Sequence, residues 1–230
     1  IQEHNTLSYG LGGKVCNFPE KPSPCGLSMH RLMERTEALH DLLDVPISMI
    51  QLSRRNAIVV QSIQPFSALA QLGLRRPYMA PFGAAFLLNA DARERGQWIE
   101  RALRNESRNS QASLRNALAC RLDRIETQGY EVIYQWEQDV LEDEGTRKGR
   151  WIGDLFEIDA RINAYRRELL GHESLSVVGE EEELMPVSRI VVPLNSPSGK
   201  VSTCVEIWLN GQQINAREAK AYADKVFDAL

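Results

Sequence analysis

Two apolar runs near the C-terminal end decide the fold: Ser188–Leu194, with the sequence SRIVVPL, and Val201–Leu209, with the sequence VSTCVEIWL. Both are rich in β-branched residues, which favour strands, and the segment between them, Asn195–Lys200 (NSPSGK), is rich in turn-forming residues. A helix is expected after the second run, because Asn215 and Glu218 form a capping-box pattern ahead of a periodic apolar face. The C-terminal part therefore predicts an antiparallel strand pair followed by a helix.

The rest of the chain alternates between helical and strand-like patterns. Apolar residues at three- and four-residue steps predict a helix that Ser23 caps, with Pro24 at its first position, and that Pro46 ends. A β-hairpin over 47–63 follows it. The later elements are expected to be a helix capped by Asp91, a helix ending at Gly129, a strand over 130–134, a charged loop over 138–150 and an amphipathic helix over 152–169. This order predicts an α+β fold, a curved antiparallel sheet with helices on its faces.

Composition limits the classes of function. The 230-residue chain, 43% hydrophobic and 25% charged, has the composition of a globular domain. A net charge of −4 argues against nucleic-acid binding by this segment, and the short basic runs Arg54–Arg55 and Arg75–Arg76 are expected to be solvated surface. No apolar run approaches the roughly 20 residues of a membrane span, so no membrane association is expected.

The cysteines and histidines show no metal-binding pattern. Cys16, Cys25, Cys120 and Cys204 form no CxxC pair, and the four histidines stand at no ligand spacing relative to them. We therefore expect no metal and no cofactor, and we expect reduced thiols in a cytoplasmic protein. The sequence also contains none of the well-known phosphate-loop and hydrolase motifs.

A candidate ligand site lies in the stretch 75–88, RRPYMAPFGAAFLL. Pro81 and Gly83 open what the pattern predicts to be an apolar helix, directly after a basic, strand-like segment. A helix start presents unpaired N–H groups and the positive end of the helix dipole, and Gly83 lets a small molecule approach those amides. The alternative is that the apolar residues of this stretch, among them Phe82 and Phe86, only bury a short core helix.

Six segments in this order resemble the effector-binding domain of IclR-type bacterial transcription regulators. They are 9–12 (YGLG), 27–43, 47–63, 77–88, 122–130 (LDRIETQGY), and 190–194 (IVVPL) with 198–201 (SGKV). The resemblance implies a GAF-like curved sheet, a pocket for a small-molecule effector, a homodimer or homotetramer, and a preceding winged helix-turn-helix that binds DNA. Residues 1–22 are then expected to be the linker from a missing DNA-binding domain, which the start at Ile1 also suggests, and residues 23–230 the effector-binding domain.

The chain departs from the family's pattern in ways that change the expected pocket. A helical and acidic insertion is expected at about 138–186. Arg189 stands near the position of a pocket cysteine, and Glu206 and Trp208 stand at the positions of two pocket serines. Strand alternation puts Ser202, Cys204, Glu206 and Trp208 on one face and Val201, Thr203, Val205, Ile207 and Leu209 on the other. The expected effector-binding residues are Ala80, Phe82, Gly83, Ala84, Arg189, Cys204, Glu206 and Trp208.

These side chains favour a larger, aromatic or amphipathic metabolite as the effector. We expect Arg189 and the amides near Gly83 to hold its carboxylate or hydroxyl, and Trp208 or Phe82 to contact its ring. The alternative is a cross-strand ion pair between Arg189 and Glu206, with Trp208 filling the core.

Two other classes of function remain open. An enzyme could draw acid–base groups from Glu137 near Tyr134, or from 172–174 (HES), but the sequence offers no nucleophile with a base and an orienting group, so no catalytic residue is predicted. The other class is a ligand-free oligomerisation module, in which Phe82 and Trp208 fill the pocket.

Overall fold

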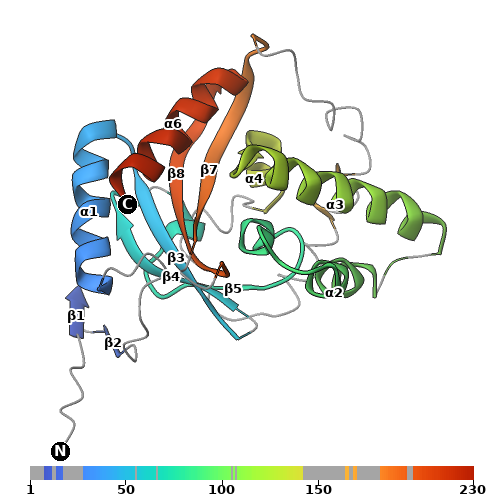
Figure 1. Cartoon of the computed structure of the whole chain (residues 1–230), viewed down its shortest axis with the longest axis horizontal. Coiled ribbons are helices and arrows are strands. Elements are labelled where there is room, and N and C mark those ends of the chain that lie inside the picture. The colour runs from blue at the N-terminus through green and yellow to red at the C-terminus, as the bar shows by residue number, and fades with distance from the viewer. Residues whose placement is uncertain are drawn as a thin grey trace, which may run out of the picture.

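A curled six-stranded sheet forms the centre of the molecule (Figure 1). The structure is a computed structural model, and it describes residues 8–11, 14–17, 28–54, 56–65, 67–104, 106, 108–141, 164–165, 168–169, 182–195 and 199–230. The strands are β3 (Ile47–Ser53), β4 (Asn56–Ile63), β5 (Arg75–Pro77), β6 (Glu131–Tyr134), β7 (Met185–Asn195) and β8 (Val201–Ile214). Their order is β5-β4-β3-β8-β7-β6, and every neighbouring pair is antiparallel. The α+β class, the antiparallel sheet and both hairpins are thereby confirmed.

The strand register brings side chains from three strands into one row. Ser48 on β3 pairs with Glu206 on β8, and Glu206 pairs with Val191 on β7. One step along the same strands, Arg189 pairs with Trp208. We call the face of the sheet that carries Arg189, Glu206 and Trp208 the inner face, and the opposite one the outer face.

A β-bulge interrupts the alternation of side chains at the start of β8. The pairing passes from Leu194–Thr203 to Asn195–Val201, so β8 has one residue more than β7 at this point. Val201 consequently packs with Cys204 in the apolar cluster of the inner face. The predicted placement of Val201 on the opposite face is therefore wrong, whereas the apolar residues after Cys204 alternate as predicted.

Two helices cover the outer face: α1 (Met29–Leu43) and α6 (Ala216–Ala229). They lie side by side in Figure 1 and bury their apolar stripes against β3, β7 and β8. The capping box of Asn215 and Glu218 is present in full, as predicted. Helix α1 has Ser28 as its N-cap, and the cap predicted at Ser23, with Pro24, lies outside the described residues.

Short 3-10 helices and three α-helices cover the inner face. They are η1 (Ala68–Ala70), η2 (Ala84–Leu87), α2 (Ala92–Leu103), α3 (Arg108–Gln128) and α4 (Gln135–Leu141). Asp91 caps α2 and Gly129, with φ +84°, follows the end of α3, both as predicted. Among the described residues, no helix combines the length and apolar character needed to cross a membrane.

Helix α4 occupies part of a stretch that the sequence predicted to be a charged loop. The prediction is wrong for residues 138–141, and the rest of that stretch lies outside the described residues. Glu137 and Gln138 are buried in this helix because Arg121 and Arg189 give them hydrogen-bonding partners. Of the helix predicted over 152–169, the described residues, 164–165 and 168–169, are helical.

The N-terminal segment contains two short strands that the sequence did not predict. β1 (Ser8–Leu11) and β2 (Lys14–Asn17) pair antiparallel and form a sheet of their own, drawn below α1 in Figure 1. The role of residues 1–22 as a linker and the limits of the insertion at 138–186 stay predictions.

Gly83 holds the chain in a conformation that a larger residue would strain. Its φ is +81°, in the left-handed region, and a Cβ at this position would lie 2.7 Å from Cδ2 of Tyr78. The Tyr78 ring is buried, so it cannot easily move away. Backbone conformation and close packing therefore explain this glycine without a ligand.

Replacing Gly83 by alanine is expected to lower the free energy of unfolding by about 2 kcal/mol, because the left-handed conformation alone costs an L-residue about 1–2 kcal/mol. Gly96→Ala is the matched control, since Gly96 lies inside α2 and nothing is within 4 Å of an added Cβ. This control should raise the free energy of unfolding by up to about 1 kcal/mol. Urea unfolding measures both, and equal effects would show that Gly83 is not constrained.

Candidate ligand site

A buried arginine–glutamate pair lies at the centre of the inner face. Arg76, on the edge strand β5, donates from Nη1 to Oε1 of Glu206 at 2.6 Å and from Nη2 to Oε2 at 2.8 Å. Nη2 also donates to the Leu69 carbonyl oxygen. The side chains of Arg76 and Glu206 are only 3% and 1% exposed, so water screens the pair very little. The two-point contact fixes the position of both groups.

Ser48, Trp208 and Arg189 complete the surroundings of the Glu206 carboxylate. Ser48 Oγ donates to Oε2 at 2.7 Å and accepts from Nε1 of Trp208 at 2.9 Å. Arg189 places Nε 3.3 Å from Oε1 of Glu206, and its Cζ lies 4.8 Å from the centroid of the Trp208 ring. The structure thus contains the cross-strand ion pair that the sequence offered as the alternative to a ligand contact.

A second charge cluster adjoins the first and centres on Arg121 of α3. Arg121 Nε donates to Oε1 of Glu131 at 2.8 Å, and its Nη1 donates to Oε2 of Glu137 at 2.6 Å. Nη1 of Arg121 also contacts the hydroxyl of Tyr165, which donates to Glu137 Oε2 at 2.9 Å. One guanidinium therefore holds two carboxylates from β6 and α4.

A small cavity lies between the two charge clusters. Its volume is about 20 Å³, and its charged lining consists of Arg76, Arg189, Glu131 and Glu206. A single water molecule needs roughly 10–15 Å³ on this measure, so the cavity holds one water-sized molecule. In this arrangement of side chains an aromatic or amphipathic metabolite does not fit.

The structure brings half of the predicted effector-binding residues to this cavity. Phe82, Gly83, Arg189 and Glu206 line it. The other four, Ala80, Ala84, Cys204 and Trp208, are buried nearby but do not belong to its lining. Trp208 and Phe82 belong to one buried apolar cluster, so the ring that was expected to contact an effector lies in the core of the protein.

The predicted helix start at Pro81 and Gly83 is wrong in length and in position. The left-handed conformation of Gly83 keeps this residue out of the helix, and η2 that follows is a single 3-10 turn. The N–H of Ala85 is not free for a ligand, because it donates to Oε2 of Glu131 at 3.2 Å. A carboxylate of the protein itself therefore occupies the place where a ligand anion was expected.

Arg76 is the residue of this site that sequence reasoning missed. The pair Arg75–Arg76 was expected to be solvated, and only Arg75 is exposed. Alternation along β5 turns successive side chains to opposite faces, so one of two neighbouring arginines had to point inward. The signal that could have indicated a buried arginine was Glu206, because a glutamate that points into the core needs a cationic partner.

The six charged groups around the cavity form two sets of opposite net charge: Arg76, Arg189 and Glu206 carry +1 together, and Arg121, Glu131 and Glu137 carry −1 when ionised. Burial alone would raise the pKa of Glu206, but the guanidinium of Arg76, with Arg189 and Ser48, outweighs burial and holds this pKa below its ordinary value. Burial raises the pKa of Glu131, which shares Arg121 with Glu137. Glu131 therefore takes up a proton more readily than Glu206.

The candidate metal ligands and acid–base groups have these surroundings among the described residues. They contain no group of three or more histidine, cysteine or acidic side chains that could hold a metal ion. Glu137, one of the candidate acid–base groups, accepts from the Tyr134 N–H at 3.1 Å and is held by Arg121. Burial raises the pKa of the Cys204 thiol, so this thiol stays protonated. The candidate group at 172–174 lies outside the described residues.

The curled sheet and the helices on its faces are shared with transcriptional regulators. No protein-family model and no curated protein sequence matches the chain. Among solved structures, it is similar to an IclR transcriptional regulator from Alicyclobacillus acidocaldarius (13% identity, TM-score 0.52, covering 87% of this chain and 64% of that one). It is also similar to an IclR family transcriptional regulator from Brucella abortus (15% identity, TM-score 0.52, 88% and 61%).

These likenesses establish the fold. The chain has the fold of the corresponding part of IclR-type regulators, as the order of its sequence motifs predicted. It spans less than two thirds of the length of either regulator. 

Replacing Arg76 by alanine is expected to lower the free energy of unfolding by about 3 to 5 kcal/mol, because it leaves Glu206 buried without its main partner. Arg75→Ala is the matched control: it removes the same charge from the neighbouring exposed position and should change stability by less than about 0.5 kcal/mol. Urea unfolding measures both variants. Similar small decreases in the free energy of unfolding of the two variants would show that the Arg76–Glu206 pair contributes little to stability, contrary to this prediction.

The protein is also expected to lose stability in acid through Glu206. Since the pKa of Glu206 is lower in the folded protein than in the unfolded chain, its ionised form stabilises the fold at higher pH. This contribution starts to fall below about pH 4.3, the ordinary value, and disappears as the pH falls through the folded-state pKa. Urea unfolding at a series of pH values should show the free energy of unfolding falling across this range. The decrease should be smaller in Glu206→Gln, which lacks this carboxylate.

A carboxyl ¹³C NMR titration of the unaltered protein provides a second measure that does not depend on a variant. It should give Glu206 a pKa below the ordinary glutamate value. A pKa at or above the ordinary glutamate value would show that burial of Glu206 outweighs its interactions with Arg76 and Arg189, contrary to this prediction.

Proposed function

We propose that this chain is the regulatory domain of a DNA-binding transcriptional regulator, and that it senses a small molecule at the inner face of its sheet. The observation that carries the proposal is the cavity beside η2, lined by the guanidiniums of Arg76 and Arg189, on a fold that regulators share. Guanidinium groups recognise carboxylates by paired hydrogen bonds, so a metabolite with a carboxylate or a comparable acceptor suits this lining.

An effector has to enlarge the cavity in order to bind. The segment that closes it, Pro81–Phe86, contains only one 3-10 turn. Hydrogen bonds from outside the turn hold this segment, among them Ala85 N–H to Glu131, Trp98 Nε1 to the Phe82 carbonyl oxygen at 3.0 Å, and Phe82 N–H to the Met79 carbonyl oxygen at 2.7 Å. An effector whose aromatic ring contacts Trp208 must also open the buried apolar cluster to which Trp208 and Phe82 both belong.

Charge limits which effector can enter. The charges of the six groups balance when all are ionised, so a bound carboxylate adds one uncompensated negative charge. The carboxylate therefore binds most easily if Glu131 takes up a proton, or if the carboxylate replaces Glu206 as the partner of Arg76. A neutral molecule with hydrogen-bond acceptors avoids this cost.

The regulatory step follows from the preference of the effector for one conformation. We propose that binding moves the segment beside η2 and shifts the spacing of paired DNA-binding heads, which a winged helix-turn-helix ahead of this chain supplies in a homodimer or homotetramer. The effector can shift the equilibrium only by its difference in affinity for the two states. DNA contact belongs to that preceding domain, and the chain itself is proposed to have no catalytic activity.

A second candidate function is a ligand-free oligomerisation module. The observation that favours it is the filled cavity: Phe82 and Trp208 lie in one buried apolar cluster, and the protein's own carboxylates bind the guanidiniums and the Ala85 amide. In this case the charge network serves only to hold the domain in one conformation.

Titration with small 2-oxo acids and aromatic carboxylates tests the sensing proposal. A compound that binds the inner face should change the indole N–H signal of Trp208, and Arg189→Ala should weaken its affinity at least about tenfold, because about 1.4 kcal/mol of binding energy corresponds to that factor. Lys220→Ala, on the exposed side of α6, is the control and should leave the affinity unchanged.

Unchanged affinity in both Arg189→Ala and Trp208→Ala would overturn the inner-face site. If no compound binds while the chain assembles into a defined oligomer in sedimentation experiments, the ligand-free module is the better account.

A further inference from the structure

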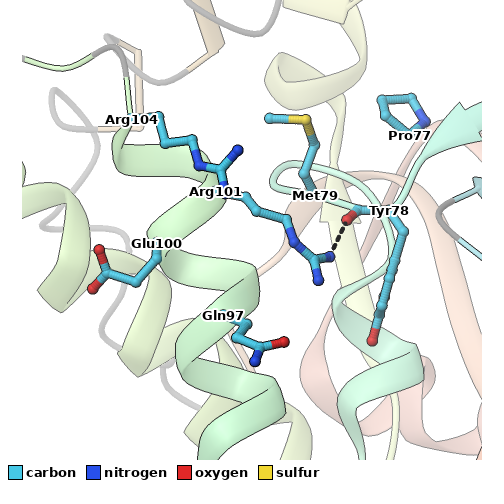
Figure 2. Close-up of a pocket in the computed structure, with 7 residues that line it drawn as sticks. All are labelled: Pro77, Tyr78, Met79, Gln97, Glu100, Arg101 and Arg104. Carbon is cyan, nitrogen blue, oxygen red and sulfur yellow. Dashed lines mark hydrogen bonds between the residues drawn. The ribbon is translucent and has the colours of Figure 1, made fainter.

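A larger, open groove lies on the other side of the segment that closes the inner cavity. Figure 2 shows it between α2 and the turn that follows β5. Its volume is about 660 Å³, within the range of roughly 300–1,000 Å³ that is typical of small-molecule sites. Pro77, Tyr78 and Met79 line one side, and Gln97, Arg101 and Arg104 of α2 line the other.

Two arginines give this groove a positive lining. Arg101 lies on α2, and Arg104, three positions later, is the C-cap residue of this helix and keeps a helical backbone conformation, so their side chains are neighbours. Arg101 reaches across the groove and donates from Nη1 to the Tyr78 carbonyl oxygen at 3.1 Å, which orients its guanidinium (Figure 2). Arg104 is exposed and has no hydrogen-bond or ion-pair partner among the described residues. Its guanidinium is therefore available to an anion.

The acidic residue of the groove does not neutralise these arginines. Glu100 points away from Tyr78 and Met79 in Figure 2. Its Oε1 accepts from Nη1 of Arg115 on α3 at 2.5 Å, so Glu100 has a cation of its own. The groove thus carries a positive charge that the described residues do not compensate.

The opposite wall is apolar and firmly held. The Tyr78 ring is buried and packs edge-on against Phe86 with the ring centroids 6.3 Å apart. The ring also packs closely against Gly83, since a Cβ at Gly83 would lie only 2.7 Å from Cδ2 of Tyr78. Met79 and Pro77 extend this wall. A flat apolar body can lie along it without any rearrangement of the core.

We propose that this groove binds a small carboxylate with a flat apolar body. The carboxylate accepts hydrogen bonds from Arg104 and from the N–H groups of Arg101 that do not bind the Tyr78 carbonyl oxygen, and the apolar body covers Met79 and Pro77. This inference does not depend on the proposed function, because the groove is open in the present arrangement and lies outside the inner cavity.

Benzoate is the probe that tests this site, and benzamide is its neutral counterpart of the same shape. The protein contains five methionines, so methyl-¹³C labelling gives a simple NMR spectrum in which Met79→Leu assigns the Met79 signal. Benzoate is expected to shift the Met79 methyl signal progressively, with an affinity at least about tenfold higher than that of benzamide.

Arg104→Ala should weaken benzoate binding at least about tenfold, because it removes the unpaired guanidinium. Arg93→Ala is the matched control: Arg93 is also exposed on α2 but does not line the groove, and its loss should leave the affinity unchanged. Both positions are on the surface, so both variants are expected to fold, and their methionine spectra verify this.

Four results would overturn the proposal: no response of Met79 to benzoate, equal affinities for benzoate and benzamide, equal effects of the two arginine variants, or a response at the Trp208 indole in place of Met79. The last result places benzoate in the inner cavity. Such a result would support the proposed sensing function and rule out the groove as the benzoate site, so the two proposals can fail separately.

Discussion

The contact between Arg76 and Glu206 is the interaction around which the inner face is built. It links the edge strand β5 to β8, three strand spacings away in the sheet, through hydrogen bonds of 2.6 and 2.8 Å between the side chains. The sheet curls toward this inner face. The same curl encloses Ser48 and Trp208, which complete the hydrogen bonds of the Glu206 carboxylate, and it defines the cavity under η2.

A buried charge is tolerated only when it has partners, and here the partners come from almost every element of the inner face. Glu206 links β8 to β5, β3 and β7, while Arg121 links α3 to β6 and α4. Glu131 extends this second set to η2 through the Ala85 amide. The network therefore ties the helices of the inner face to the sheet by directional contacts, in addition to the apolar packing that both faces share.

Local chemistry explains which parts of the structure the sequence predicts. The capping box at Asn215, the helix end at Gly129 and the two long hairpins depend on residues close together in the chain, and the structure has all of them. Other features depend on partners far away in the chain or on another helix: the burial of Arg76, the helical Glu137 and the occupied Ala85 amide. A local pattern does not identify such partners, even where alternation requires one of two arginines to point inward. Arg189 and Glu206 were predicted because the family resemblance puts both near pocket positions and strand alternation puts Glu206 on one face with Trp208. The contact between the two side chains leaves little space for a ligand.

The two edges of the sheet are short, and this limits how copies of the chain can associate. β5 has three residues, one of which is Pro77 and lacks an N–H, and β6 has four. An incoming strand would find few main-chain hydrogen bonds along β5 or β6, so sheet extension through these two strands is disfavoured. The helices that cover both faces of the sheet then offer the larger surfaces for contact between copies of the chain, and such contacts do not use the strands as a template for aggregation.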